Sequence, residues 1–185
     1  MSLRIWAGDM PLTMSIACAS GPGVALDLDA MSYEIRTKEV PDHAVATMRM
    51  HTSLTEIPQA MRATLNALAT HVTPKPSAAT PFAIFYNEPF KPDDIDVEMG
   101  IAIDRDAAVD TQGGVRRRVV PTETIAYTVH VGSYATIGKA YTALFDWLRK
   151  TGHRPIGAPR EIYVVGPDEE KSSALYVTEL EVPIA

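Results

Sequence analysis

The chain has 185 residues, of which 46% are apolar and 22% are charged, and its formal net charge is -6. These are ordinary values for a folded domain, which needs neither metals nor cross-links to form a core. The acidic balance argues against a nucleic-acid partner, because phosphate binding requires clustered lysine and arginine. Cys18 is the single cysteine, so a disulfide within the chain is excluded, as suits a reducing cytoplasm.

Residues 1–30 are predicted to be a leader, either a tail or an extra strand. Their one apolar patch is short, covers residues 16–19 and follows Asp9 and Pro11, a pattern that does not resemble a secretory signal. No apolar run approaches the roughly 20 residues that cross a bilayer. We therefore expect a cytoplasmic protein that makes no membrane contact.

The remaining residues, 31–185, repeat themselves at a spacing of 80 residues. This spacing is too long for a solenoid and indicates two halves of one domain, residues 31–104 and residues 113–185. The identical pairs are Arg36 and Arg116, Val40-Pro41 and Val120-Pro121, Ala46 and Ala126, Ser53 and Ser133, Ile57 and Ile137, Ala60 and Ala140, Ala63 and Ala143, and Leu68 and Leu148.

Each half shows the same order of elements. An extended stretch rich in β-branched residues comes first, then an amphipathic helix, then two strands. In the first half these are residues 34–51, a helical stripe from Ile57 to Leu68, and strands at 81–87 and 95–103, with a proline-rich loop at 71–81. In the second half they are residues 115–131, a stripe from Ile137 to Leu148, and strands at 160–166 and 174–184.

The fold class expected from this order is α+β. Tandem duplicated β-α-β-β units form one curved antiparallel sheet with two helices on one face, related by a pseudo-twofold axis. A crevice between the repeated elements would be a natural ligand site, since neither half closes it alone. Arg49 stands where the repeat predicts an apolar residue, which indicates either a β-bulge or a paired arginine.

One strand carries a carboxylate. Alternation along Arg160–Val165 places Glu161 and Tyr163 on the same face, about 6–7 Å apart. A carboxylate beside aromatic rings offers a counter-charge and a cation–π surface to a cationic ligand. An exposed strand face, where glutamate is common, is the alternative. The matching positions of the first half are Ala83 and Phe85, so the acid occurs once while the aromatic position is kept.

Further aromatic residues lie nearby in the sequence. Tyr134 follows a Gly-Ser turn ahead of the second helix, where a core residue is hard to bury, so it is a pocket candidate. Tyr141 and Phe145 lie within the helix and are typical of a core, whereas Trp147 could serve either purpose. The candidate ligand-binding residues are Glu161, Tyr163, Tyr134, Trp147, Tyr127 and Phe85.

Other motifs are absent or weak. The five histidines are scattered without metal-ligand spacing, so we expect no metal site. Residues 21–23 lack the rest of a dinucleotide fingerprint, and we expect no cofactor. The basic run at residues 116–118 is divided between the two faces of a strand, as on a solvated sheet edge.

Three motifs together resemble a known family. They are Val131-Gly132-Ser133-Tyr134 before the second helix, Glu161-Ile162-Tyr163 on a strand, and the ending from Thr178 to Ile184. In their order and spacing, residues 31–184 are similar to the gyrase-inhibitor-like, or effector-binding, domains of multidrug-responsive transcription regulators. The resemblance implies a tandem β-α-β-β fold that binds bulky aromatic or cationic compounds between its helices, with Glu161 as the pocket acid and Tyr163 and Tyr134 as wall residues.

The resemblance leaves three functions open. The first is a stand-alone effector-binding domain, since only about 30 residues precede the first repeat and no DNA-reading helix pair fits there. The second is a hydrolase of strained electrophilic compounds, an activity of some relatives, with Glu161 as the general base of the same pocket. The third is a protein-inhibiting module, with a protein partner that binds its acidic surface.

Overall fold

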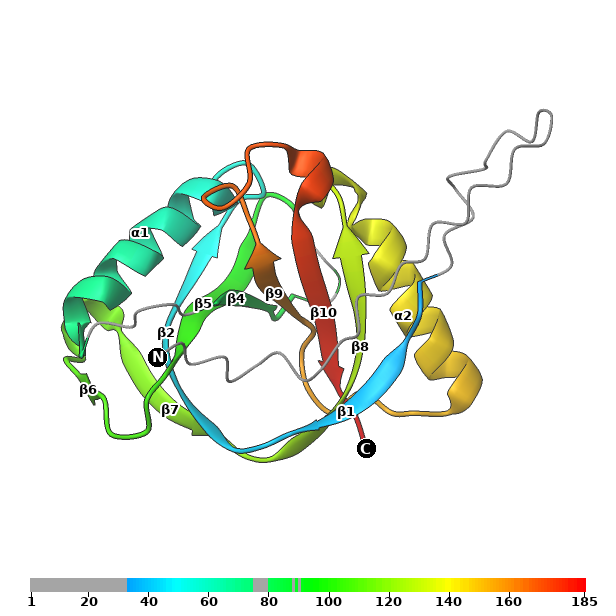
Figure 1. The fold of residues 1–185 in the computed structure, drawn as a ribbon, viewed down its shortest axis with the longest axis horizontal. Helices are drawn as coiled ribbons and strands as arrows, with labels where there is room; N and C mark the ends of the chain where they lie inside the picture. The colour runs from blue at the N-terminus through cyan, green and yellow to red at the C-terminus, as the bar shows by residue number, and fades with distance from the viewer. Residues whose placement is uncertain (1–32, 75–79, 88, 90) are drawn as a thin grey trace, which may run out of the picture. The chain divides into compact units, whose positions relative to one another are not determined.

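The computed structural model describes residues 33–74, 80–87, 89 and 91–185 (Figure 1). The leader expected at residues 1–30 lies outside the described residues. The described part contains two α-helices, an eight-stranded antiparallel sheet and a two-stranded ribbon. The helices are α1 (Ile57–His71) and α2 (Gly138–Thr151). The strands are β1 (Arg36–Val40), β2 (His43–Thr52), β3 (Val72–Thr73), β4 (Pro81–Phe85), β5 (Ile95–Ile103), β6 (Ala108–Val109), β7 (Arg116–Val120), β8 (Glu123–Val131), β9 (Arg160–Val165) and β10 (Val177–Pro183).

The order of strands in the large sheet is symmetric. It runs β1-β8-β10-β9-β4-β5-β2-β7. Exchanging each strand of the first half for its counterpart in the second (β1 for β7, β2 for β8, β4 for β9 and β5 for β10) reverses this order and leaves it unchanged. The centre of the sheet therefore lies between β9 and β4, where the two halves meet. The α+β architecture with one curled sheet is as predicted.

The repeated Val-Pro pair marks where the chain leaves one edge of the sheet for the other. The extended stretches predicted at 34–51 and 115–131 each divide into two strands at this proline. β1 then pairs with β8 while β2 pairs with β7, so each half contributes an edge strand beside the other half. The two turns touch, because the backbone N–H of Asp42 donates to Oγ1 of Thr122 at 3.1 Å.

Both helices pack on the same face of the sheet (Figure 1). α1 buries Thr64 and Leu68, and α2 buries one side through Ala140, Leu144 and Leu148. The helix α2 ends at Gly152, whose φ of 78° is the left-handed conformation that glycine adopts without strain. Among the described residues no helix has the length and apolar character needed to cross a lipid bilayer.

The structure corrects the expectation for residues 71–81 and decides between the two alternatives for Arg49. The stretch 71–81, predicted as a loop, begins with β3, which pairs with β6 in the connection between the halves. Arg49 lies in a regular β2–β5 ladder, so its position is not a bulge. Its side chain instead pairs with Asp96 and lies over the ring of Tyr86, 3.9 Å from the centroid.

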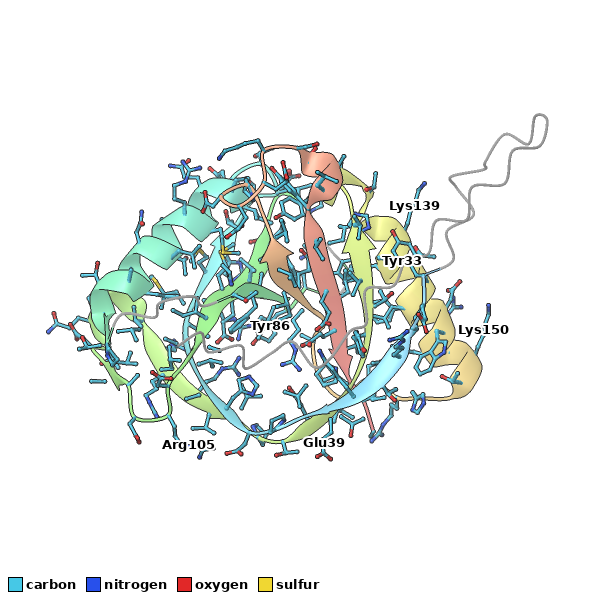
Figure 2. The ribbon with its side chains drawn as sticks, in the orientation of Figure 1. Tyr33, Glu39, Tyr86, Arg105, Lys139 and Lys150 are labelled. Atoms are coloured by element: carbon cyan, nitrogen blue, oxygen red, sulfur yellow. The ribbon has the colours of Figure 1, made fainter. Side chains whose placement is uncertain are left out.

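The face of the sheet away from the helices carries paired charges. Figure 2 shows Tyr86 there, within the curve of the sheet, where its hydroxyl donates to Glu98 at 2.6 Å. Arg118 of β7 pairs with Glu98 at 3.3 Å, and at the equivalent place of the other half Lys38 of β1 pairs with Glu179 at 2.6 Å. Burial and the neighbouring Glu181 raise the pKa of Glu179 to about 7.

Gly100 on β5 permits the close packing of this face. A Cβ at this position would lie 2.6 Å from the carbonyl oxygen of Ala46 and 2.9 Å from the ring of Phe82. We expect Gly100→Ala to lower the free energy of unfolding by about 1–3 kcal/mol, because backbone must move to admit the methyl group. Chemical denaturation measures the loss.

Gly138 at the start of α2 provides the matched control, since a Cβ there meets nothing within 4 Å. Gly138→Ala should leave the stability unchanged or raise it by up to about 1 kcal/mol through helix propensity. Equal destabilisation by both substitutions would contradict the packing argument.

Candidate functional site

Glu161 lies at the centre of the sheet and faces the helices. Its neighbours across the ladder are Ala83 on β4 and Leu180 on β10. Residues opposite one another in an antiparallel ladder share a face. Leu180 packs in the core beneath α2, and Ala83 packs with residues of α1, so Glu161 stands on the helix-covered face between the two cores.

The carboxylate is buried and accepts hydrogen bonds from two tyrosines. Tyr141 of α2 donates to Oε1 at 2.9 Å, and Tyr163 of β9 donates to Oε2 at 3.0 Å. Only 7% of Glu161 is exposed. Burial raises the pKa of Glu161, while the two phenol donors act in the opposite direction by stabilising the ionised form.

Among the described residues Glu161 has no basic partner. The adjacent Arg160 points to the opposite face, where its guanidinium pairs with Glu123 and with Glu181, at 2.7 Å for the latter. The alternation of the strand therefore separates the acid from the nearest arginine. Within the described part of the chain, the carboxylate is stabilised by the two phenol hydrogen bonds and has no counter-charge.

The tyrosines extend the site along the same face. Tyr134 packs edge-on against Tyr163, with ring centroids 5.6 Å apart, and its ring lies 5.2 Å from that of Tyr176. Tyr134 belongs to a short 3-10 turn ahead of α2 and is 37% exposed. Burial raises the pKa of Tyr134 to about 12, and it raises that of Tyr163 as well, so both phenols stay protonated at neutral pH.

The first half of the domain supplies an apolar wall. Phe85 of β4 lies in the same partly exposed cluster as Tyr163, together with side chains of α1. The half-buried members of this cluster are Met50, Ile57, Ala60, Met61, Phe85 and Tyr163. The arrangement thus joins one buried acid, phenol hydroxyls and apolar side chains on one face.

The structure brings four of the six candidate residues together: Glu161, Tyr163, Tyr134 and Phe85. Tyr127 needs a correction, because it pairs across the ladder with Glu181 and so lies on the opposite face of the sheet, under the ammonium group of Lys38. The residue of β8 that packs with α2 is instead the small Ala126.

Trp147 also lies apart from the carboxylate cluster. Its ring stacks on that of His153, with centroids 5.1 Å apart, near the C-terminal end of α2 and beside the core that packs beneath this helix. Two residues of the site were not predicted, Tyr141 and Tyr176. The helical stripe indicated that Tyr141 faces the sheet, but nothing in the stripe shows that its hydroxyl reaches a carboxylate.

The fold and this site define an α+β domain with one curled sheet and a buried acid at its centre. The family model of the GyrI-like small molecule binding domain matches residues 31–185, and the chain belongs to this family. No curated protein matches the chain.

Solved structures share the fold. EcmrR in complex with DNA matches 85% of this chain with a TM-score of 0.74 and 23% identity, and this chain spans 59% of that EcmrR chain. The EcmrR C-terminal domain matches with a TM-score of 0.70 and 23% identity, and the match covers 84% of this chain and 99% of that domain. A hydrolase from Listeria innocua matches with a TM-score of 0.60 and 12% identity, and the match covers 82% of this chain and 92% of the hydrolase chain. SAV2435 bound to tetraphenylphosphonium matches with a TM-score of 0.53 and 9% identity, and the match covers 82% of this chain and 94% of the SAV2435 chain.

The raised pKa of Glu161 predicts a dependence of stability on pH. A carboxyl whose pKa is raised by folding stabilises the protein at low pH, and this contribution is lost as the pH rises through the raised value. We therefore expect Glu161→Gln to raise Tm near neutral pH, with a gain that shrinks toward the ordinary pKa of 4.5. Thermal unfolding of both proteins from about pH 4 to about pH 8 measures this. Parallel curves for the two proteins would show that the buried charge is not destabilising.

Proposed function

We propose that this domain binds small aromatic or cationic organic molecules at Glu161, between α1 and α2. The observation that carries the proposal is a buried carboxylate that has two phenol donors and no basic partner among the described residues. Removing a carboxylate from water is costly unless a counter-charge compensates it. An organic cation beside Glu161 would supply that charge.

The residues around the acid suit a large, weakly hydrated cation. Tyr134, Tyr163 and Tyr176 offer ring surfaces to a positive charge, and Phe85 and Met61 offer apolar contact from the other side. Such a cation loses little hydration free energy on entering the site. The tetraphenylphosphonium complex of SAV2435, which shares the fold, supports this class of ligand.

We further propose that the chain acts in the cytoplasm as a receptor or sequestering protein for such compounds, without reading DNA itself. The relationship to EcmrR, whose structure is a complex with DNA, supports a domain that responds to an effector. The acidic composition supports a cationic ligand over a nucleic acid.

Neutralising Glu161 tests the counter-charge. Tetraphenylphosphonium should bind the wild-type protein, and Glu161→Gln should bind it at least about 10-fold more weakly, equivalent to about 1.4 kcal/mol. Neutral triphenylphosphine oxide should bind both proteins equally. Isothermal titration calorimetry at pH 8 measures the dissociation constants.

Glu98 supplies the matched control. It is also 7% exposed and also accepts a hydrogen bond from a tyrosine, but it lies on the other face of the sheet and pairs with Arg118. Glu98→Gln should leave tetraphenylphosphonium binding unchanged. Wild-type affinity in Glu161→Gln, or an equal loss in both variants, would overturn the proposal.

A second candidate function is hydrolysis at the same site. It is favoured by the pKa of Glu161, which burial raises and which makes the carboxylate a stronger general base, and by the shared fold with the hydrolase from Listeria innocua. Glu161 would remove a proton from the water whose oxygen attacks a carbon of a strained epoxide ring. The ring C–O bond then breaks, and the alkoxide takes up a proton from solvent to give a diol. Mass spectrometry after incubation with aryl epoxides should then show a diol with wild type and none with Glu161→Gln, while intact epoxide in both would exclude this activity for that class.

A further inference from the structure

The helix-covered face of the sheet also holds a hydroxyl without a partner. Thr178 on β10 is fully buried, and among the described residues its Oγ1 has no hydrogen-bond partner. Folded proteins satisfy nearly all buried polar groups, and unpaired donors are rarer in them than unpaired acceptors. A hydroxyl left unpaired next to a binding site therefore indicates a partner that arrives with the ligand.

Thr178 lies beside the carboxylate. Its neighbours across the ladder are Tyr163 on β9 and His130 on β8. Glu161 pairs with Leu180, two residues further along β10, so it is the diagonal neighbour of Thr178. Diagonal neighbours in an antiparallel ladder are about 7–8 Å apart.

The polar groups of its two neighbours are engaged elsewhere. The hydroxyl of Tyr163 donates to Glu161. His130 uses both ring nitrogens, Nε2 with the carbonyl oxygen of Ser133 at 3.1 Å and Nδ1 with the hydroxyl of Tyr33 at 2.8 Å. Figure 2 shows Tyr33 beside α2. Neither side chain can turn toward Thr178 without losing a hydrogen bond of its own.

The ladder is irregular at the same point. The register between β10 and β9 shifts between Val177 and Thr178, so one residue of β9 is left without a partner there. Bulges of this kind re-aim side chains and occur often next to functional sites. Two residues before Thr178, the ring of Tyr176 contacts the partly exposed ring of Tyr134, so this end of β10 adjoins the tyrosines of the site.

We propose that the ligand site extends from Glu161 to Thr178 and selects organic cations that carry a hydrogen-bond acceptor, such as a carbonyl oxygen, at that separation. The cation lies against Glu161, and the hydroxyl of Thr178 donates to the acceptor. This inference rests on the proposed function, since Glu161 holds the cationic end.

Two kinds of probe separate the contribution of Thr178 to binding from that of Glu161. Tetraphenylphosphonium has no acceptor, while its meta- and para-acetylphenyl derivatives carry a carbonyl on one ring. Wild type should bind at least one acetyl derivative about fivefold more tightly than the parent. Thr178→Val, which keeps the shape and removes the hydroxyl, should abolish this gain, leave the parent cation bound as before, and raise Tm because an unpaired hydroxyl is gone.

Thr47 is the matched control, because its Oγ1 is equally buried and unpartnered within the described part of the chain but lies on the other side of the sheet, opposite Gly100. Thr47→Val should raise Tm without changing either affinity. The role of Thr178 would be overturned if wild type bound neither acetyl derivative more tightly than the parent cation, or if Thr178→Val kept the tighter binding. In either case, binding of the parent cation would still support the site at Glu161. Failure of the parent cation to bind wild type would overturn both.

Discussion

The hydrogen bonds that Tyr141 and Tyr163 donate to Glu161 lie at the centre of the sheet, between the cores beneath the two helices. Tyr141 packs with the core under α2, and Tyr163 packs with the cluster that includes α1. The carboxylate is therefore held by one donor from each core. Because burial opposes its ionisation and the phenols favour it, the charge on Glu161 depends on what occupies the space beside it.

The two halves share a fold but contribute different chemistry. In the repeat, Tyr141 corresponds to Met61 at a spacing of 80, and Glu161 and Tyr163 correspond to Ala83 and Phe85 at a spacing of 78. The second half thus supplies the acid and both hydroxyl donors, while the first half supplies apolar side chains at the same places. A symmetric pair of acids would repel across the central strands, whereas this arrangement gives one charged wall and one apolar wall. An amphipathic cation, charged at one point and apolar elsewhere, matches such a pair of walls.

The repeat and the alternation of strand residues were enough to predict the fold and the common face of Glu161 and Tyr163. The identities at a spacing of 80 predicted two alike halves, and the period of two placed Glu161 and Tyr163 on one face, although the turns at Val40-Pro41 and Val120-Pro121 were not predicted. Alternation does not say which face meets a helix. Tyr127 was therefore listed with the candidate site residues although it lies on the opposite face, since Ala126 is the residue of β8 that packs with α2.

The residues that were missed depend on contacts between elements. Tyr141 had the periodicity of a core residue, and only the approach of α2 to β9 brings its hydroxyl to Glu161. Trp147, six residues further along the same helix, is displaced by about 9 Å along its axis, because each residue advances a helix by about 1.5 Å. The spacing of residues along one helix cannot show which of its aromatic side chains belongs to the site, because that depends on the distance to a residue on another element.

The opposite face of the sheet explains why a cation would bind on one side only. Glu98 and Glu161 are buried to the same extent, and each accepts a hydrogen bond from a tyrosine. Arg118 neutralises Glu98, however, and Lys38 and Arg160 do the same for the glutamates of β10. A further cation would there meet basic side chains that already pair with these glutamates. On the helix-covered face, each hydrogen bond from Tyr141 and Tyr163 spreads the charge of Glu161 without cancelling it, so the attraction for a cation remains there.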